Sequence, residues 1–268
     1  MSFPLTHLLI ADELLTRINH TNEAPKNQSS KNQAPQHIFQ SQIIDAPSFL
    51  LGAIAPDAIH YRKTLPTDQG GIGPAKKITH LCPISNEPWG QVTDNDGWVN
   101  CVKSFVQSKA TSQATSKTAN DDASDSAIQT TNNTPALIQG YATHVLTDLY
   151  NNKTLWHRFR SKHPQEAAKG YASGYYQDLT NIDIHLYQQL PQVSQIWSQL
   201  AKAIPQEMPG LVSEEEIIAL QKNILYDNYK PPLPTSSQNY AYVTFEESIA
   251  WIQEAADFVQ EVLFSNAP

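Results

Sequence analysis

Apolar residues recur along this chain at the three- and four-residue intervals of an amphipathic helix. Near the start, Leu8, Leu14 and Ile18 fall on one face of a helix predicted over residues 5–19. The same spacing predicts further helices over residues 95–107, 135–151, 164–189, 213–227 and 244–264. Sustained alternation of apolar and polar residues is not found, so strands are expected to be few and the fold all-α.

Local signals indicate where several of these helices begin or break. Gly170 and Gly174 make the region 164–189 either one long helix or a broken pair, because glycine weakens a helix interior. A capping box, in which Ser or Thr precedes Glu by three residues, marks a helix start. This pattern occurs at Ser213 with Glu216 and at Thr244 with Glu247.

Two polar segments interrupt the helical pattern, residues 20–40 and residues 108–134. Both are rich in Asn, Gln, Ser, Thr and other small or polar residues, which bury too little apolar surface to offset the entropy of ordering. We therefore expect mobile inserts, with domain boundaries as the alternative. Candidate functional residues lie on both sides of each segment, which favours a single helical domain spanning residues 1–268.

Composition limits the possible roles of the protein. The 268 residues are 40% hydrophobic, an ordinary value for a globular protein with a core. The net charge of -8 disfavours a general nucleic-acid partner, although a small anion at a local positive site remains compatible with it. The two cysteines, Cys82 and Cys101, predict neither a disulfide framework nor a thiolate metal site.

The N-terminal stretch MSFPLTHLLIADELL has no basic start, and two acidic residues follow its short apolar run. This pattern is a poor match to a signal peptide. No apolar run is long enough for a transmembrane helix, so a cytoplasmic location is the expectation.

The segment GYATHVLTDLYNN, residues 140–152, carries the best local signal for chemistry. His144 and Asp148 are four residues apart on a predicted helix, so both side chains project from one face. An imidazole and a carboxylate so placed suit one zinc ion. The alternative is a helix cap or a surface ion pair, because this spacing also arises by chance.

Three further segments contain candidate ligands. In FLLGAIAPDAIHYR, Asp57 follows Pro56, either as a carboxylate held at a rigid turn or as a helix N-cap, and His60 is a possible second ligand. In KKITHL and PLTHL, His80 and His7 each follow a threonine on an apolar segment. A lone histidine in such a place is more often a core residue than a ligand.

The order of these motifs resembles the zinc-dependent phospholipase C family, whose all-helical fold is shared with P1-type nucleases. The order is TH, then GAIAPD, then a second TH, then GYATHVLTD, within about residues 5–190. The resemblance implies a single multi-helix domain of the phospholipase C / P1 nuclease type with one or two zinc ions. Its ligands would be His7, Asp57, His80, His144 and Asp148, with Asp148 bridging and Asp57 orienting or deprotonating water.

The family's remaining metal ligands have no clear counterpart here. The chain starts with Met-Ser-Phe in place of the family's processed N-terminal Trp. For the family's third metal, the available residues His157, Asp178, Asp183 and His185 have the wrong spacing.

Three functions compete at this point. The first is a metal-dependent hydrolase of phosphodiester or phosphate ester bonds, including lipid head groups, since zinc acidifies bound water and stabilises charge on phosphate oxygens. The second is a non-catalytic, metal-stabilised helical protein, and the third is a helical interaction module without metal. Four tryptophans either line a pocket or pack in the core: Trp89, Trp98, Trp156 and Trp197.

Overall fold

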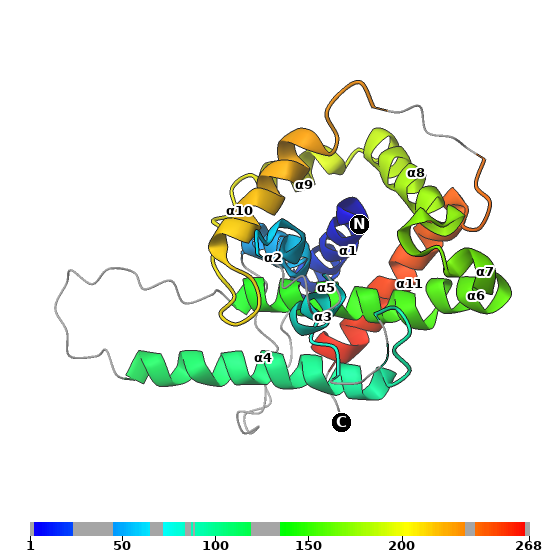
Figure 1. Ribbon diagram of the computed structural model, residues 1–268. Helices are drawn as coiled ribbons and strands as arrows, with labels where there is room; N and C mark the ends of the chain where they lie inside the picture. Colours follow the sequence, from blue (N-terminus) through cyan, green and yellow to red (C-terminus); the bar gives the residue numbers. More distant parts are fainter. Residues whose placement is uncertain are drawn as a thin grey trace.

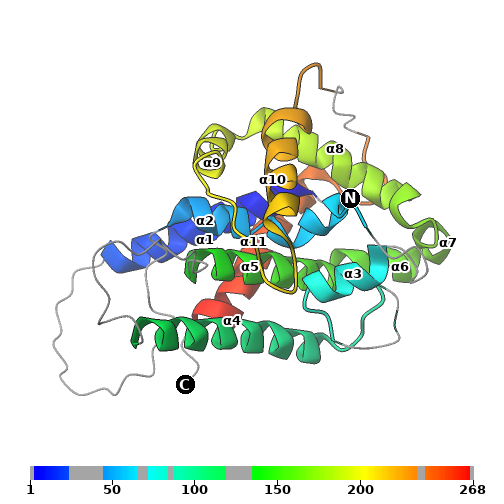
Figure 2. The same ribbon diagram turned by 60° about the vertical axis from the view of Figure 1, so that its left-hand side comes forward.

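A computed structural model of the protein describes residues 3–23, 45–64, 72–83, 87, 89–118, 135–233 and 239–265 (Figures 1 and 2). Within these ranges the chain forms helices and no strand, with a single isolated bridge between Met208 and Val212. The all-α prediction is confirmed for this part of the chain. The elements are α1 (Pro4–Glu23), α2 (Ala46–Gly52), the 3-10 helix η1 (Ala55–Tyr61), α3 (Ile72–Thr79), α4 (Asn95–Thr118), α5 (Pro135–Lys153), α6 (Leu155–Lys162), α7 (Pro164–Ala167), the 3-10 helix η2 (Gly170–Ala172), α8 (Gly174–Gln189), α9 (Val193–Leu200), α10 (Glu214–Lys222), the π-helical turn η3 (Asn223–Asp227) and α11 (Phe245–Phe264).

Helix α5 lies in the middle of the molecule, with α4 along one side and α1 and α2 on the other (Figures 1 and 2). Nearly every residue of α5 from Ala136 to Leu149 is buried, including the polar residues Thr143 and His144. A helix that is buried on all faces must be surrounded by other elements. Polar side chains on α5 therefore face protein or an internal site.

Two glycines set the distance between α2 and α5. A Cβ atom at Gly140 would overlap the carbonyl oxygen of Phe49, and one at Gly52 would overlap the carbonyl oxygen of Leu137. Glycine at both positions lets the two backbones approach closely. This contact places the residues that follow α2, including Ala53 and η1, directly against α5.

Helix α11 holds α1 and α5 together. It crosses both helices in the fold and packs against each of them (Figure 1). Towards α1, Arg17 forms an ion pair with Asp257 at 2.5 Å. Towards the end of α5, Tyr150 stacks on Phe258 with ring centroids 5.1 Å apart.

The predicted inserts are partly helical, which corrects their interpretation as loops. Residues 108–118 continue α4 without a break, and α1 extends to Glu23. Once a helix has formed over residues 95–107, each further residue adds one hydrogen bond, and the Ser-, Ala- and Lys-containing sequence tolerates that continuation. Residues 24–40 and 119–134 of the two predicted inserts lie outside the described residues.

The predicted helix starts and breaks are otherwise present. The region 164–189 is broken at Gly170, whose φ of 56° favours glycine. Ser213 and Glu216 form the capping box of α10 reciprocally, while Thr244 accepts the backbone N–H of Glu247 at the start of α11. No helix in the described part of the chain combines the length and apolar character needed to cross a membrane.

Candidate metal centre

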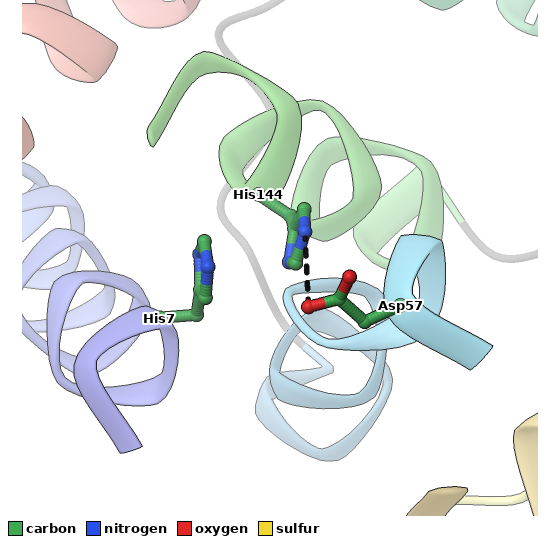
Figure 3. A group of neighbouring side chains, drawn as sticks. All are labelled: His7, Asp57 and His144. Atoms are coloured by element: carbon green, nitrogen blue, oxygen red, sulfur yellow. Dashed lines mark ion pairs between the residues drawn. The ribbon is translucent and has the colours of Figure 1, made fainter. Parts of the chain in front are cut away.

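The structure brings all five predicted ligands into one cluster, in which Asp148 is partly exposed and the other four are buried. They come from four separate segments: His7 from α1, Asp57 from η1, His80 from the residue after α3, and His144 and Asp148 from α5. Figure 3 shows His7, Asp57 and His144 pointing toward one another from three elements. Two overlapping groups have ligand atoms close enough to share an ion, namely His7, Asp57 and His144, and His80, His144 and Asp148.

The backbone fixes the tautomer of His144 and also contacts the ring of His80. Nδ1 of His144 lies 2.8 Å from the carbonyl oxygen of Ala53, and Nδ1 of His80 lies 3.0 Å from that of Lys76. A carbonyl oxygen only accepts hydrogen bonds, so Nδ1 of His144 carries the proton. Nδ1 of His80 also lies 2.9 Å from the hydroxyl oxygen of Thr79, which can donate to it, so either ring nitrogen of His80 can hold the proton. The Nε2 lone pair of His144 is therefore free in the neutral ring, as in histidines oriented for metal binding.

The Nε2 atoms of His80 and His144 are 3.2 Å apart. The free lone pair of His144 Nε2 faces His80, so it can accept a proton held on His80 Nε2 or bind a cation together with that nitrogen. Two nitrogens bound tetrahedrally to zinc would be separated by about 3.3 Å, given bonds of about 2.0–2.1 Å. The donor set and its spacing therefore fit a divalent ion.

Asp148 lies between two groups of histidines. Its Oδ2 is 3.3 Å from Nε2 of His80 and 4.0 Å from Nε2 of His144. Its Oδ1 is 3.5 Å from Nε2 of His7, whose ring stacks on that of His144 with centroids 3.9 Å apart. One carboxylate thus presents an oxygen to each side, as a bridge between two ions requires.

Asp57 has four cationic or polar neighbours. Its Oδ1 lies 3.0 Å from Nζ of Lys76 and 3.5 Å from Nε2 of both His60 and His80, while its Oδ2 is 3.8 Å from Nε2 of His144. The predicted alternative of a helix N-cap is wrong, because Asp57 lies inside η1 and Ile54 occupies the cap position. Pro56 fits the first turn of η1, where its missing N–H has no cost.

The neighbours determine which groups carry charge. Burial alone would raise the pKa of Asp57 and of Asp148, but Lys76 and the surrounding histidines outweigh it and hold both pKa values well below the ordinary range. Burial, together with the proximity of His7, lowers the pKa of His144 well below its ordinary value. The centre therefore contains ionised carboxylates and a neutral imidazole, the forms that bind metal.

A cavity opens onto this cluster. Its lining contains His7, Asp57 and Asp148 together with aromatic side chains, among them Trp89, Trp98, Trp156, Tyr171 and Tyr176. Three of the four tryptophans thus line the cavity, which was one of the two predicted alternatives, although Trp98 is also a core residue. Trp197 packs instead against Tyr187 and Tyr229.

Sequence reasoning missed Lys76, which also lines this cavity. Burial lowers the pKa of Lys76, but the carboxylates of Asp57 and Asp148 more than compensate, so its pKa lies above the ordinary value and the side chain is an ammonium. Lys76 lies four residues before His80, whose backbone N–H bonds to the Lys76 carbonyl at the end of α3, so the two side chains are one helical turn apart. This spacing was available in KKITHL.

The four candidates for a third metal site are not gathered. Asp178 accepts the backbone N–H groups of residues 241–243, and His185 Nδ1 lies 3.0 Å from the hydroxyl of Tyr240. His157 lies beside Arg160, and Asp183 accepts hydrogen bonds from Thr6 and Tyr229. Within the described ranges, none of the four belongs to a group with metal-binding geometry.

Asp183 instead gives a testable pH dependence. Burial raises its pKa from 3.8 to about 6, so the folded protein keeps a proton there that the unfolded chain has lost. Between these two pKa values stability falls as pH rises, by up to about 3 kcal/mol from this group. In metal-free protein, Asp183→Asn is therefore expected to gain stability relative to wild type from pH 4 to pH 7, measured by urea unfolding. Parallel pH profiles for the two proteins would contradict this assignment.

Comparison with known proteins adds no relative: no family model, no curated protein and no solved structure matches this chain.

Proposed function

We propose that this protein is a metal-dependent hydrolase of phosphodiester or phosphate ester bonds, with an all-α fold of the phospholipase C / P1 nuclease type. The main support is the gathering of the five residues into two overlapping groups, His7 with Asp57 and His144, and His80 with His144 and Asp148, whose ligand atoms lie within 4.8 Å of one another. The Nδ1–H of His144 is committed to the carbonyl oxygen of Ala53, which leaves Nε2 of His144 for a cation. The ordered motifs and the bridging position of Asp148 support the same function.

The chain's own residues would hold one or two zinc ions as follows. His80, His144 and Asp148 would hold one ion, and His7, Asp57 and His144 would hold the other. Bound there, a divalent ion would supply an acidified water and an electrophile for phosphate oxygens.

Asp57 would orient the attacking water. Because its pKa is held well below the ordinary range, its carboxylate stays ionised and accepts a hydrogen bond more readily than it takes a proton. Its Oδ1 is occupied by Lys76, which leaves Oδ2 on the side of His144. The aromatic walls of the cavity would exclude bulk water and hold the substrate, a small phosphoester or a lipid head group.

Removing the metal is expected to destabilise the protein. The empty centre confines two carboxylates beside three imidazoles, so a bound ion stabilises the folded protein. At a free-ion concentration about a thousand times Kd, the free energy of unfolding rises by about 4 kcal/mol. For a chain of this size we expect the melting temperature to fall by about 10 °C on chelation. The measurement is elemental analysis of protein purified without added metal, with melting curves before and after chelator treatment.

A pair of histidine variants serves as the control. His144→Ala should lose bound metal and the chelator response, whereas His157→Ala, which lies outside both candidate groups, should keep both. An unchanged melting curve after chelation would favour a helical interaction module instead.

A non-catalytic, metal-stabilised protein is the second candidate. It is favoured by one observation: the described residues hold no third group of ligands. An assay of the metal-loaded protein on p-nitrophenyl phosphate and bis(p-nitrophenyl) phosphate separates the two candidates. Failure on every phosphoester by a fully loaded protein would leave the non-catalytic role.

A further inference from the structure

Lys76 is a buried cation inside the candidate centre. The residue is only 5% exposed, and its Nζ lies 3.0 Å from Oδ1 of Asp57. The same ammonium lies over the ring of Trp89, 5.1 Å from the centroid. Lysine is almost never fully buried unless it is paired, because its charge must be compensated. Its position beside a candidate metal ligand therefore requires a physical explanation.

The ammonium has more donors than the protein uses. Lysine presents three N–H groups. In the part of the chain that the structure describes, Asp57 is its only ion-pair partner within 4.0 Å, while Asp148 acts on it from farther away. Lys76 lines the same cavity as His7, Asp57 and Asp148, so its remaining donors are available to a ligand held against those residues.

The charges of the centre favour an anion in that cavity. Asp57, Asp148 and Lys76 together carry one net negative charge, and one divalent ion makes the centre positive. Tyr171 and Tyr176 also line the cavity and bring phenolic donors, which burial keeps protonated by raising their pKa values. A positively charged head group would be repelled by the ammonium of Lys76.

We propose that Lys76 is the anion-binding residue of this centre, and that its ammonium contacts a non-bridging oxygen of the substrate's phosphate group. The proposal rests on the proposed function and narrows its substrate class. Phosphate esters whose remaining part is neutral or anionic are accepted, whereas esters with a cationic head group are disfavoured. Lys76 contributes a fixed positive charge that is retained whether one or two metal ions bind.

The test measures binding of inorganic phosphate to the zinc-loaded protein by isothermal titration calorimetry. Lys76→Gln removes the charge but keeps a donor for Asp57. Its affinity for phosphate is expected to fall about 10- to 100-fold, the loss typical of a charge-assisted hydrogen bond, while its zinc content stays that of wild type. Lys76→Arg, which keeps the charge, should bind within a few-fold of wild type.

Lys77→Gln is the matched control, because Lys77 is the next residue of α3 and its Nζ donates to the backbone of Glu87. This variant should bind phosphate as wild type does. Equal phosphate affinity in wild type and zinc-loaded Lys76→Gln would overturn the proposal, as would a zinc-loaded wild type that binds no phosphate.

A crystal structure of the zinc-loaded wild-type protein with phosphate decides the matter if Lys76→Gln does not fold or loses zinc. We expect Nζ of Lys76 within hydrogen-bonding distance of a phosphate oxygen; phosphate bound away from Lys76 would overturn the proposal.

Phosphate bound by Lys76 without hydrolysis of any ester would reject the proposed function alone. Hydrolysis that is unchanged in Lys76→Gln, with unchanged phosphate binding, would reject this inference alone.

Discussion

Asp57→Asn is expected to retain a helical, zinc-binding protein whose hydrolysis of a model phosphodiester falls by about 10²- to 10⁴-fold, the usual contribution of a group that positions or accepts a proton. The carboxylate is buried beside Lys76, His60 and His80, and the neutral amide lacks the charge that balances the Lys76 ammonium and that would orient the water. The measurement is kcat on bis(p-nitrophenyl) phosphate, normalised to bound zinc.

Asp178→Asn provides the comparison for that variant. Asp178 is also a buried carboxylate, but it accepts backbone N–H groups of residues 241–243 and lies outside both ligand groups. Its replacement should lower stability by about 1–3 kcal/mol and leave kcat per folded molecule unchanged. If the Asp57 variant loses only melting temperature, and wild type has no activity to lose, the metal has a structural role.

Gly140→Ala is expected to reduce the free energy of unfolding by about 3–5 kcal/mol, an unusually large effect for one methyl group. The added Cβ would overlap the carbonyl oxygen of Phe49, a backbone atom that cannot rotate away. Helices α2 and α5 would have to separate, and the Nδ1 contact of His144 with Ala53 would lengthen with them. The free energy of unfolding, measured with urea, and the zinc content should therefore decrease together.

Gly73→Ala is the matched glycine variant. Gly73 lies in α3, and a Cβ there meets nothing within 4 Å. Alanine is the better helix former, so this change should be neutral or stabilising by up to about 1 kcal/mol. Similar stabilities for the two alanine variants would show that the contact between α2 and α5 can relax.

Most helices could be predicted because their spacing and caps are local properties. The capping box of Ser213 and Glu216, and the break at Gly170, depend on residues within one turn. The continuation of α4 through residues 108–118 could not be predicted from composition, because a helix already formed over residues 95–107 makes each added residue inexpensive.

The convergence of the five candidate ligands was predicted from the order of short motifs, although no single motif was specific. The charge partner of Asp57 was not predicted, since Lys76 and Asp57 lie in separate segments and meet only through the packing of α3 against η1. The third-metal candidates failed for a related reason. The carboxylates of Asp178 and Asp183 accept hydrogen bonds from distant segments. Sequence spacing carries no information about such pairings.

The position of α11 has a consequence for how the centre is assembled. This helix contributes none of the five ligands, yet it bridges α1 and α5, and in synthesis it follows all four ligand-bearing segments. A nascent chain that already contains His7, His80 and His144 therefore still lacks α11, the helix that packs against both α1 and α5. Ion capture is expected to be a late event in biogenesis, after residues 245–264 have left the ribosome.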